Sequence, residues 1–266
     1  MGRIDDVFAK RAAEGKKVLV TYLCVGDPDA ERSIALALAC AEEGADVLEL
    51  GCPFSDPSAD GVAIARASQR ALARGGGLAE TLEVARAIRE KSDVPLVLFG
   101  YYNPLFVRGE QDAARAVANA GVDALLVVDL PIDESTPLRE ACAVRNVGVV
   151  PLVAPTTKLD RIEKIGLFAN RYPVPFVYYV SMTGVTGGAG ASEVLGKAGE
   201  EAKRVREVTK RPTVVGFGID SADRARIAAE HADGVVVGSE IVRRIEKDPK
   251  SDAAVRELVR DLRASL

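Results

Sequence analysis

Eight short apolar runs recur along the chain, separated by segments with helical periodicity. Each run is rich in Val and Leu and apolar almost throughout, which is typical of parallel strands covered on both faces. The runs cover residues 17–23, 46–50, 95–100, 124–129, 148–153, 175–180, 213–218 and 234–238. Eight β/α units in 266 residues predict a TIM (β/α)8 barrel that fills the whole chain, 1–266, as a single domain. An open doubly wound sheet is the alternative.

The polar segments between the runs predict the helices of the barrel. Helical periodicity covers residues 29–43, 78–91, 112–120, 134–144, 158–168, 191–210 and 221–230. An additional amphipathic segment, residues 4–14, precedes the first strand. We expect it to form an extra N-terminal helix that plugs the N-terminal mouth of the barrel.

Composition and charge exclude several classes of function. The net charge is −4 and the basic residues are scattered, which argues against a nucleic-acid or membrane surface. No apolar run reaches the ~18 residues of a membrane span. The N-terminus has no apolar signal core, so we expect a cytoplasmic protein.

Cysteine and histidine usage argues against a metal site. Cys24, Cys40, Cys52 and Cys142 are far apart and show no C-x-x-C spacing. The one histidine, His231, follows a predicted helix directly, where a cation is favourable, and we interpret it as structural. We therefore expect no metal centre.

The second apolar run carries a carboxylate, Glu49, between Leu48 and Leu50. Side chains alternate along a strand, so if the leucines pack under the helices, Glu49 points into the barrel. A buried carboxylate that only satisfies a structural partner is the alternative interpretation. The loop that follows contains Asp56 and Asp60, which favours an active site. A carboxyl in an apolar barrel has a raised pKa, whereas an exposed loop carboxylate stays ionised, and such a pair suits proton transfer.

Glycines at the ends of the last three predicted strands indicate a phosphate site. They occur within the segment Gly184–Gly190, on either side of Phe217 (Gly216 and Gly218), and at Gly238. Glycine lets backbone N–H groups approach an anion closely, and this edge of a TIM barrel commonly holds phosphate. Ser239 is placed to cap the following predicted helix, residues 240–246, whose N-terminus favours a phosphate. Asp220 is expected to face away from the anion. Aromatic residues at other strand ends are expected to line a flat apolar pocket: Tyr22, Phe99, Tyr101 and Tyr178. The alternative is that these rings only fill the mouth of the barrel.

Residues 49–61, Glu-Leu-Gly-Cys-Pro-Phe-Ser-Asp-Pro-Ser-Ala-Asp-Gly, closely resemble the signature of the tryptophan synthase alpha chain family. The resemblance extends along the chain. Its other segments are Gly26-Asp27-Pro28, Asp129-Leu130-Pro131, Gly184-Val185-Thr186-Gly187 and Gly216-Phe217-Gly218-Ile219.

This resemblance implies retro-aldol cleavage of indole-3-glycerol phosphate to indole and glyceraldehyde 3-phosphate, in the last steps of tryptophan biosynthesis. Glu49 matches the general acid and base, and Asp60 matches the carboxylate that receives the indole N–H. Tyr178 matches a tyrosine near the glutamate, and Thr186 a loop threonine that orients Asp60. Phosphate-binding positions match Gly187, Gly218, Gly238 and Ser239, and Phe217 lies among them as a candidate substrate contact.

The resemblance also implies a partner, the beta chain, in an αββα heterotetramer. Pyridoxal phosphate is expected only in that partner, so this subunit needs no cofactor. Pro53, Asp56 and Pro57 match part of the contact surface. The sequence departs from the family at residues 62–65, Val-Ala-Ile-Ala, where Pro-x-Ile-Gln is usual, and at the glycine-rich residues 187–190. Neither change removes a catalytic residue. Both are expected to affect the coupling to the beta chain.

Three other functions compete with this interpretation. A stand-alone lyase of the same chemistry would release free indole without a partner. A non-catalytic partner subunit is disfavoured because both Glu49 and Asp60 are present. A phosphate-sugar epimerase would need metal-binding histidines, which His231 alone cannot supply.

Overall fold

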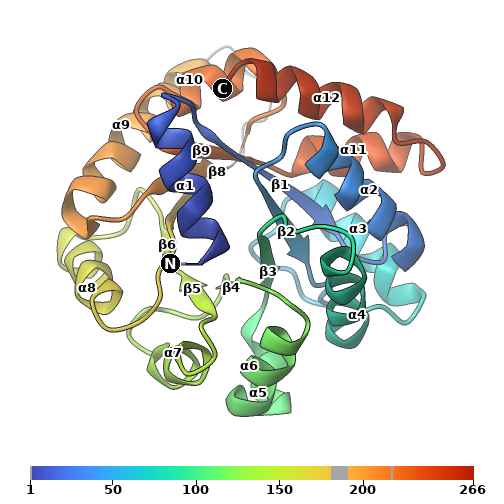
Figure 1. Cartoon of the computed structure of the whole chain (residues 1–266), viewed down its shortest axis with the longest axis horizontal. Coiled ribbons are helices and arrows are strands. Elements are labelled where there is room, and N and C mark those ends of the chain that lie inside the picture. Colours follow the sequence, from blue (N-terminus) through green and yellow to red (C-terminus); the bar gives the residue numbers. More distant parts are fainter. Residues whose placement is uncertain (1, 181–190, 217) are drawn as a thin grey trace.

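The computed structural model describes residues 2–180, 191–216 and 218–266, and twelve helices and nine strands lie in that part of the chain. All strand pairs are parallel, in the order β5-β4-β3-β2-β1-β9-β8-β7-β6. Figure 1 shows the strands as a central ring with the helices around it. The strands are β1 Val18–Cys24, β2 Val47–Gly51, β3 Leu96–Gly100, β4 Ala124–Val127, β5 Gly148–Val150, β6 Leu152–Val153, β7 Val177–Val180, β8 Thr213–Gly216 and β9 Gly234–Val237. The predicted TIM barrel is confirmed.

The predicted fifth strand is divided in two, which corrects the expectation of one continuous strand. β5 pairs with β4, whereas β6 pairs with β7. Between them lies Pro151, which has no N–H to donate to a ladder. The carbonyl of Pro151 still accepts from Tyr178 N at 3.0 Å. One chain segment therefore joins the two ends of the sheet covalently.

Most helices match the predicted segments to within a few residues. They are α1 Arg3–Ala13, α2 Ala30–Glu42, α4 Leu78–Arg89, α6 Glu110–Asn119, α7 Thr136–Ala143, α8 Leu159–Ala169, α9 Ala191–Thr209, α10 Ala222–Ala229 and α11 Ser239–Lys247. Helical periodicity did not single out α3 Val62–Ala73, α5 Tyr102–Arg108 or α12 Ala253–Ala264. No helix in the described residues is long and apolar enough to cross a bilayer.

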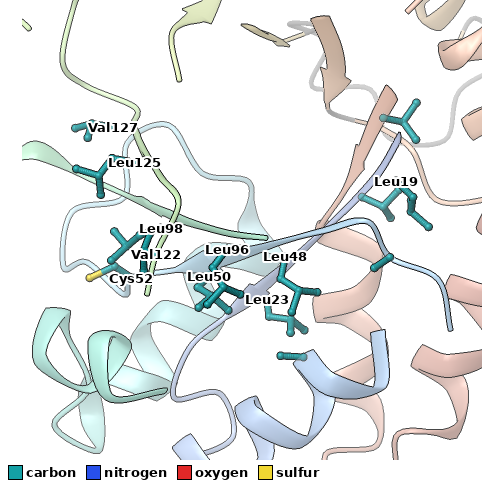
Figure 2. Packing of buried hydrophobic residues seen from close by; sticks show 14 of the residues in the cluster. Leu19, Leu23, Leu48, Leu50, Cys52, Leu96, Leu98, Val122, Leu125 and Val127 are labelled. Carbon is teal, nitrogen blue, oxygen red and sulfur yellow. The ribbon is translucent and has the colours of Figure 1, made fainter. Parts of the chain in front are cut away.

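The hydrophobic core has two layers, one outside the strands and one inside. Leu48 and Leu50 belong to the outer layer, between strands and helices, together with Leu36 of α2 and Ile88 of α4. Figure 2 shows Leu48 and Leu50 beside Leu96 and Leu98 of the neighbouring strand β3. Val47, by contrast, belongs to the inner layer. The predicted alternation along β2 is confirmed.

The extra N-terminal helix α1 lies across one opening of the barrel (Figure 1). Its apolar residues Ile4 and Phe8 are buried in the inner layer of the core. The Phe8 ring lies 5.6 Å from the ring of Phe176, centroid to centroid, directly before β7. The helix therefore closes the N-terminal mouth, as predicted, and ligands reach the barrel interior from the opposite, C-terminal end.

Candidate active site

A cavity of about 520 Å³ lies at the C-terminal ends of the strands. Its wall combines acidic, aromatic and glycine residues from almost every strand of the barrel. The lining residues are Tyr22, Glu49, Ser58, Ala59, Asp60, Ile64, Phe99, Val128, Leu152, Val153, Ala154, Thr157, Tyr178, Val180, Gly218, Ile219, Asp220, Val236, Gly238, Ser239 and Arg243. This end of a TIM barrel is where active sites form.

Glu49 is a fully buried carboxyl that faces the cavity from the middle of β2. It is 1% exposed, and its Oε1 has no hydrogen-bond partner among the described residues. Burial in apolar surroundings penalises the ionised form and raises the pKa of Glu49 to about 8. At neutral pH this side chain therefore carries a proton that it can donate.

Asp60 is held at the rim of the cavity by the loop after β2. It is partly buried, and this burial raises the pKa of Asp60 to about 6, while a hydrogen bond from Tyr101 lowers it. Tyr101 also accepts a hydrogen bond from Ala59 N at 3.0 Å, so it fixes the loop on both sides of the Ala59–Asp60 peptide. The expectation of an exposed loop carboxylate is corrected: Asp60 is half-shielded, and its pKa lies closer to that of Glu49 than the sequence indicated.

Three of the four predicted aromatic residues line the cavity. Tyr22 packs edge-on against Phe99, with ring centroids 5.3 Å apart, and Tyr178 lines the cavity from β7. Tyr22 and Tyr178 each lie over a glycine: a Cβ at Gly51 would lie 2.2 Å from the Tyr22 hydroxyl, and a Cβ at Gly216 only 2.0 Å from that of Tyr178. These glycines leave room for the rings. Tyr101 is placed behind Asp60 and not in the cavity wall.

The glycine-rich edge lies in the same cavity, across from the acids. Gly218 has φ +74, which favours glycine, and no atom of the described residues lies within 4 Å of a Cβ built there. Gly238 is the N-cap of α11, and Ser239 is the first residue within the helix. Ser239 therefore does not cap the helix as expected. Its position still directs the first N–H groups of a helix toward the cavity, which favours an anion.

Comparisons with known proteins identify the family of the chain. The family model described as "Tryptophan synthase alpha chain" matches residues 8–264. The chain belongs to the tryptophan synthase alpha chain family. The alpha chain of Burkholderia thailandensis is 45% identical, with 100% of this chain and 97% of the relative covered. That of Geotalea daltonii is 42% identical over 93% of this chain and 91% of the relative.

Solved structures of alpha chains show the same fold. The tryptophan synthase alpha subunit of Legionella pneumophila superposes with a TM-score of 0.89 at 33% identity, covering 100% of this chain and 98% of that one. A chain of M. tuberculosis tryptophan synthase in its aminoacrylate-bound form superposes with a TM-score of 0.84 at 32% identity. The match covers 100% of this chain and 99% of that one.

Several residues expected from the alpha chain signature can now be placed. Asp56 is exposed, Pro57 partly buried and Pro53 buried, so only part of the expected contact surface is open to a partner. α3 begins at Val62, where the family usually has proline, and Gly61 serves as its N-cap. The helix therefore starts without the proline. Three expected residues, Thr186, Gly187 and Phe217, lie outside the described residues.

Sequence reasoning missed several residues of this alpha chain's cavity. Asp220 was expected to face away; it lines the cavity, and its carboxylate is paired with Arg224 one turn into α10. Ile64 and Arg243 were not singled out, although each lies within the first turns of a helix that follows a site loop. The Nε2 of His231 donates to the carboxylate of Glu200 in α9 at 2.9 Å, which fits its structural interpretation. Within the described residues, no group of three His, Cys, Asp or Glu side chains is placed to hold a metal ion.

An ion-pair network ties the acidic side of the cavity to the glycine-rich side. Arg70 of α3 makes two 2.8 Å bonds to Asp27, after β1, and one of 2.7 Å to Glu246 of α11. Arg66, also in α3, binds both oxygens of Glu246 at 2.6 and 3.0 Å. Since α3 follows the Asp60 loop and α11 begins at Ser239, the network fixes the two ends of the site relative to each other.

Proposed function

We propose that Glu49 and Asp60 carry out the reaction of the alpha chain family, cleavage of indole-3-glycerol phosphate, in this cavity. The observation that supports this most is Glu49 itself, a carboxyl buried in the cavity wall, protonated at neutral pH, whose Oε1 has no hydrogen-bond partner among the described residues. Carboxyl groups whose pKa is raised by burial in a cavity wall are concentrated at sites of proton transfer. The aromatic wall suits the indole ring, and the glycine-rich edge suits the phosphate.

Glu49 acts first as an acid and then as a base. It donates its proton to carbon 3 of the indole ring, which breaks the aromaticity of the pyrrole and leaves positive charge on the ring nitrogen. The carboxylate then takes the proton of the glycerol hydroxyl next to the scissile bond. The electrons of that C–C bond return to the ring, releasing indole and the aldehyde, and Glu49 is protonated again.

Asp60 stabilises the charge that forms on the ring nitrogen. As an anion it accepts the indole N–H, an interaction that strengthens when the ring is protonated. Tyr101 orients the carboxylate by its hydrogen bond. We further propose that Tyr22, Phe99 and Tyr178 enclose the ring. Gly218, Gly238 and Ser239, together with Thr186, Gly187 and Phe217, would then complete the substrate site.

A beta chain is the proposed partner, and its pyridoxal phosphate is the only cofactor the pair would need. Exposed residues beside the cavity mouth support a contact surface there. Asp56 is exposed, and Phe106 and Val107 of α5 are 62% and 78% exposed. The Phe54 ring stacks on Tyr101 at 4.7 Å, which joins the Asp56 loop to the start of α5. We place the pair in the cytoplasm.

Indole release from indole-3-glycerol phosphate tests the proposed function. We expect weak activity of the chain alone and an increase of about 5- to 150-fold when a tryptophan synthase beta chain is added, the usual range of coupling between sites. High activity alone, with no increase, would instead identify a stand-alone lyase. Absence of indole in both conditions would refute the enzymatic function.

The pH dependence of kcat/KM is expected to be bell-shaped, with limbs near the two pKa values. Below about pH 6 Asp60 becomes protonated and loses its charge, and above about pH 8 Glu49 loses the proton that it must donate. The substrate phosphate also titrates near pH ~6. Asp60→Asn distinguishes the titration of Asp60 from that of the substrate phosphate. The residual activity of this variant should lose the acidic limb of the pH profile and keep the basic limb. An acidic limb that persists in this variant would assign it to the phosphate.

A further inference from the structure

The charges around the cavity are unbalanced for a phosphorylated substrate. Three carboxyl groups line it: that of Glu49, which is protonated at neutral pH, that of Asp60, and that of Asp220, which is paired with Arg224. Among its described lining residues, Arg243 is the only cation. A phosphate monoester carries about −1.5 to −2 charges at pH 7. Helix N–H groups supply only a partial positive charge, roughly half an elementary charge. The phosphate end of the cavity therefore has one full charge available to it.

Arg243 lies where its guanidinium reaches the first turn of α11. It stands four residues after Ser239, so the two residues share one face of the helix. Long side chains in a helix point back toward its N-terminus, which directs the Arg243 head group toward Gly238 and Ser239. All three residues line the cavity. The bonds from Arg66 and Arg70 to Glu246 hold the α11 backbone in place.

Most hydrogen-bond donors of Arg243 have no partner within the described ranges. Its NH1 donates to Glu240 at 3.2 Å, a weak bond within one helical turn. The guanidinium has five N–H donors in a planar fork that matches two oxygens of a phosphate. The side chain is 40% exposed, so it can turn from Glu240 to a ligand without disturbing the core.

We propose that Arg243 is a substrate-binding residue that donates hydrogen bonds to the phosphate group at the N-terminus of α11. This assignment rests on the proposed function, since it names the residue that gives the site its preference for a phosphorylated substrate. Glu240 holds the guanidinium beside the anion position, and the ligand phosphate then competes for the same donors. Ionised Asp60, at the other end of the cavity, repels an anion, so Arg243 also sets which way round the substrate enters.

The test compares a phosphorylated and an unphosphorylated ligand in wild type, Arg243→Met and Arg243→Lys. Indole-3-propanol phosphate and indole-3-propanol differ only in the phosphate and do not react, so calorimetry measures binding alone. Arg243→Met is expected to weaken binding of the phosphate ester about 10- to 100-fold, as for loss of a charged hydrogen bond. Binding of the alcohol should stay within about twofold, and Arg243→Lys should recover part of the loss because the charge is kept.

Kinetics and a charge control complete the test. In indole release, Arg243→Met should raise KM by the same factor and leave kcat within about threefold, since the interaction is equal in ground and transition states. Arg115→Met removes the same charge from a position on α6 that is 61% exposed, and it should change the binding of neither ligand. Equal loss for both ligands, or a phosphate ester that wild type binds no better than the alcohol, would overturn the assignment. Absence of indole release with Arg243-dependent binding intact would refute only the proposed function.

Discussion

Replacing Glu49 by glutamine is expected to lower kcat for indole release by about 10²- to 10⁴-fold, the usual contribution of a general acid and base. The amide has the same shape as the carboxyl and is neutral, as the buried acid is at pH 7. It cannot protonate a ring carbon or accept a proton from a hydroxyl. Binding of indole-3-propanol phosphate should therefore remain, and single-turnover measurements should show the loss in the chemical step.

The same variant is expected to be more stable than wild type above pH ~5. The pKa of Glu49 rises from 4.5 to about 8 on folding, so the unfolded chain ionises this group over a range in which the folded protein keeps it protonated. The free energy of unfolding of wild type therefore falls as the pH rises from about 4.5 to 8 and is level beyond. Glutamine does not titrate, so the difference in the free energy of unfolding should grow over this range to about 5 kcal/mol.

Urea unfolding at several pH values measures this difference. A gap between Glu49→Gln and wild type that is constant from pH 5 to 8 would show that Glu49 is not protonated by burial. Activity retained within tenfold would show that another group transfers the proton. Leu48→Met provides a matched control, because it changes the adjacent residue of β2 on the outer face and leaves the acid in place.

Asp60→Asn is expected to lower kcat by about 10²- to 10³-fold, as for removal of a group that stabilises transition-state charge. Asparagine still accepts the hydrogen bond from Tyr101, so the loop keeps its shape while the anion is lost. The effect should fall on kcat more than on KM, because positive charge on the indole nitrogen develops only during the reaction.

A control for Asp60→Asn is Asp112→Asn, which makes the same change at an exposed position of α6, 57% exposed. It should leave kcat and KM unchanged. If Asp60→Asn raised KM and left kcat intact, Asp60 would be only a binding residue for the neutral indole N–H.

The sequence predicted the barrel and the acid because both depend on local patterns. Alternation along residues 46–50 places Leu48 under the helices and Glu49 in the cavity, and the structure has this arrangement. α3 was not singled out because it has no capping side chain and begins with the motif that follows Asp60. The division between β5 and β6 depends on which neighbour each half pairs with, and no local pattern encodes that.

Tertiary packing decides the features of the site that were not predicted. The partial burial of Asp60 depends on Tyr101, which is 41 residues away in the chain and reaches the loop from the end of β3. Arg243 has no motif of its own, and its place in the cavity follows from where α11 starts. A helical wheel beginning at Ser239 would have identified it.

The register of β2 sets both the packing and the chemistry of this protein. Glu49 lies opposite Tyr22 in β1 and Val97 in β3. A slip of one residue would exchange the two faces of the strand, burying the acid beneath helices and presenting a leucine to the substrate. Such a barrel would still be compact, but it would have no catalytic activity. Measured activity is therefore a sensitive report on correct strand alignment, where spectroscopic measures of secondary structure would see no difference.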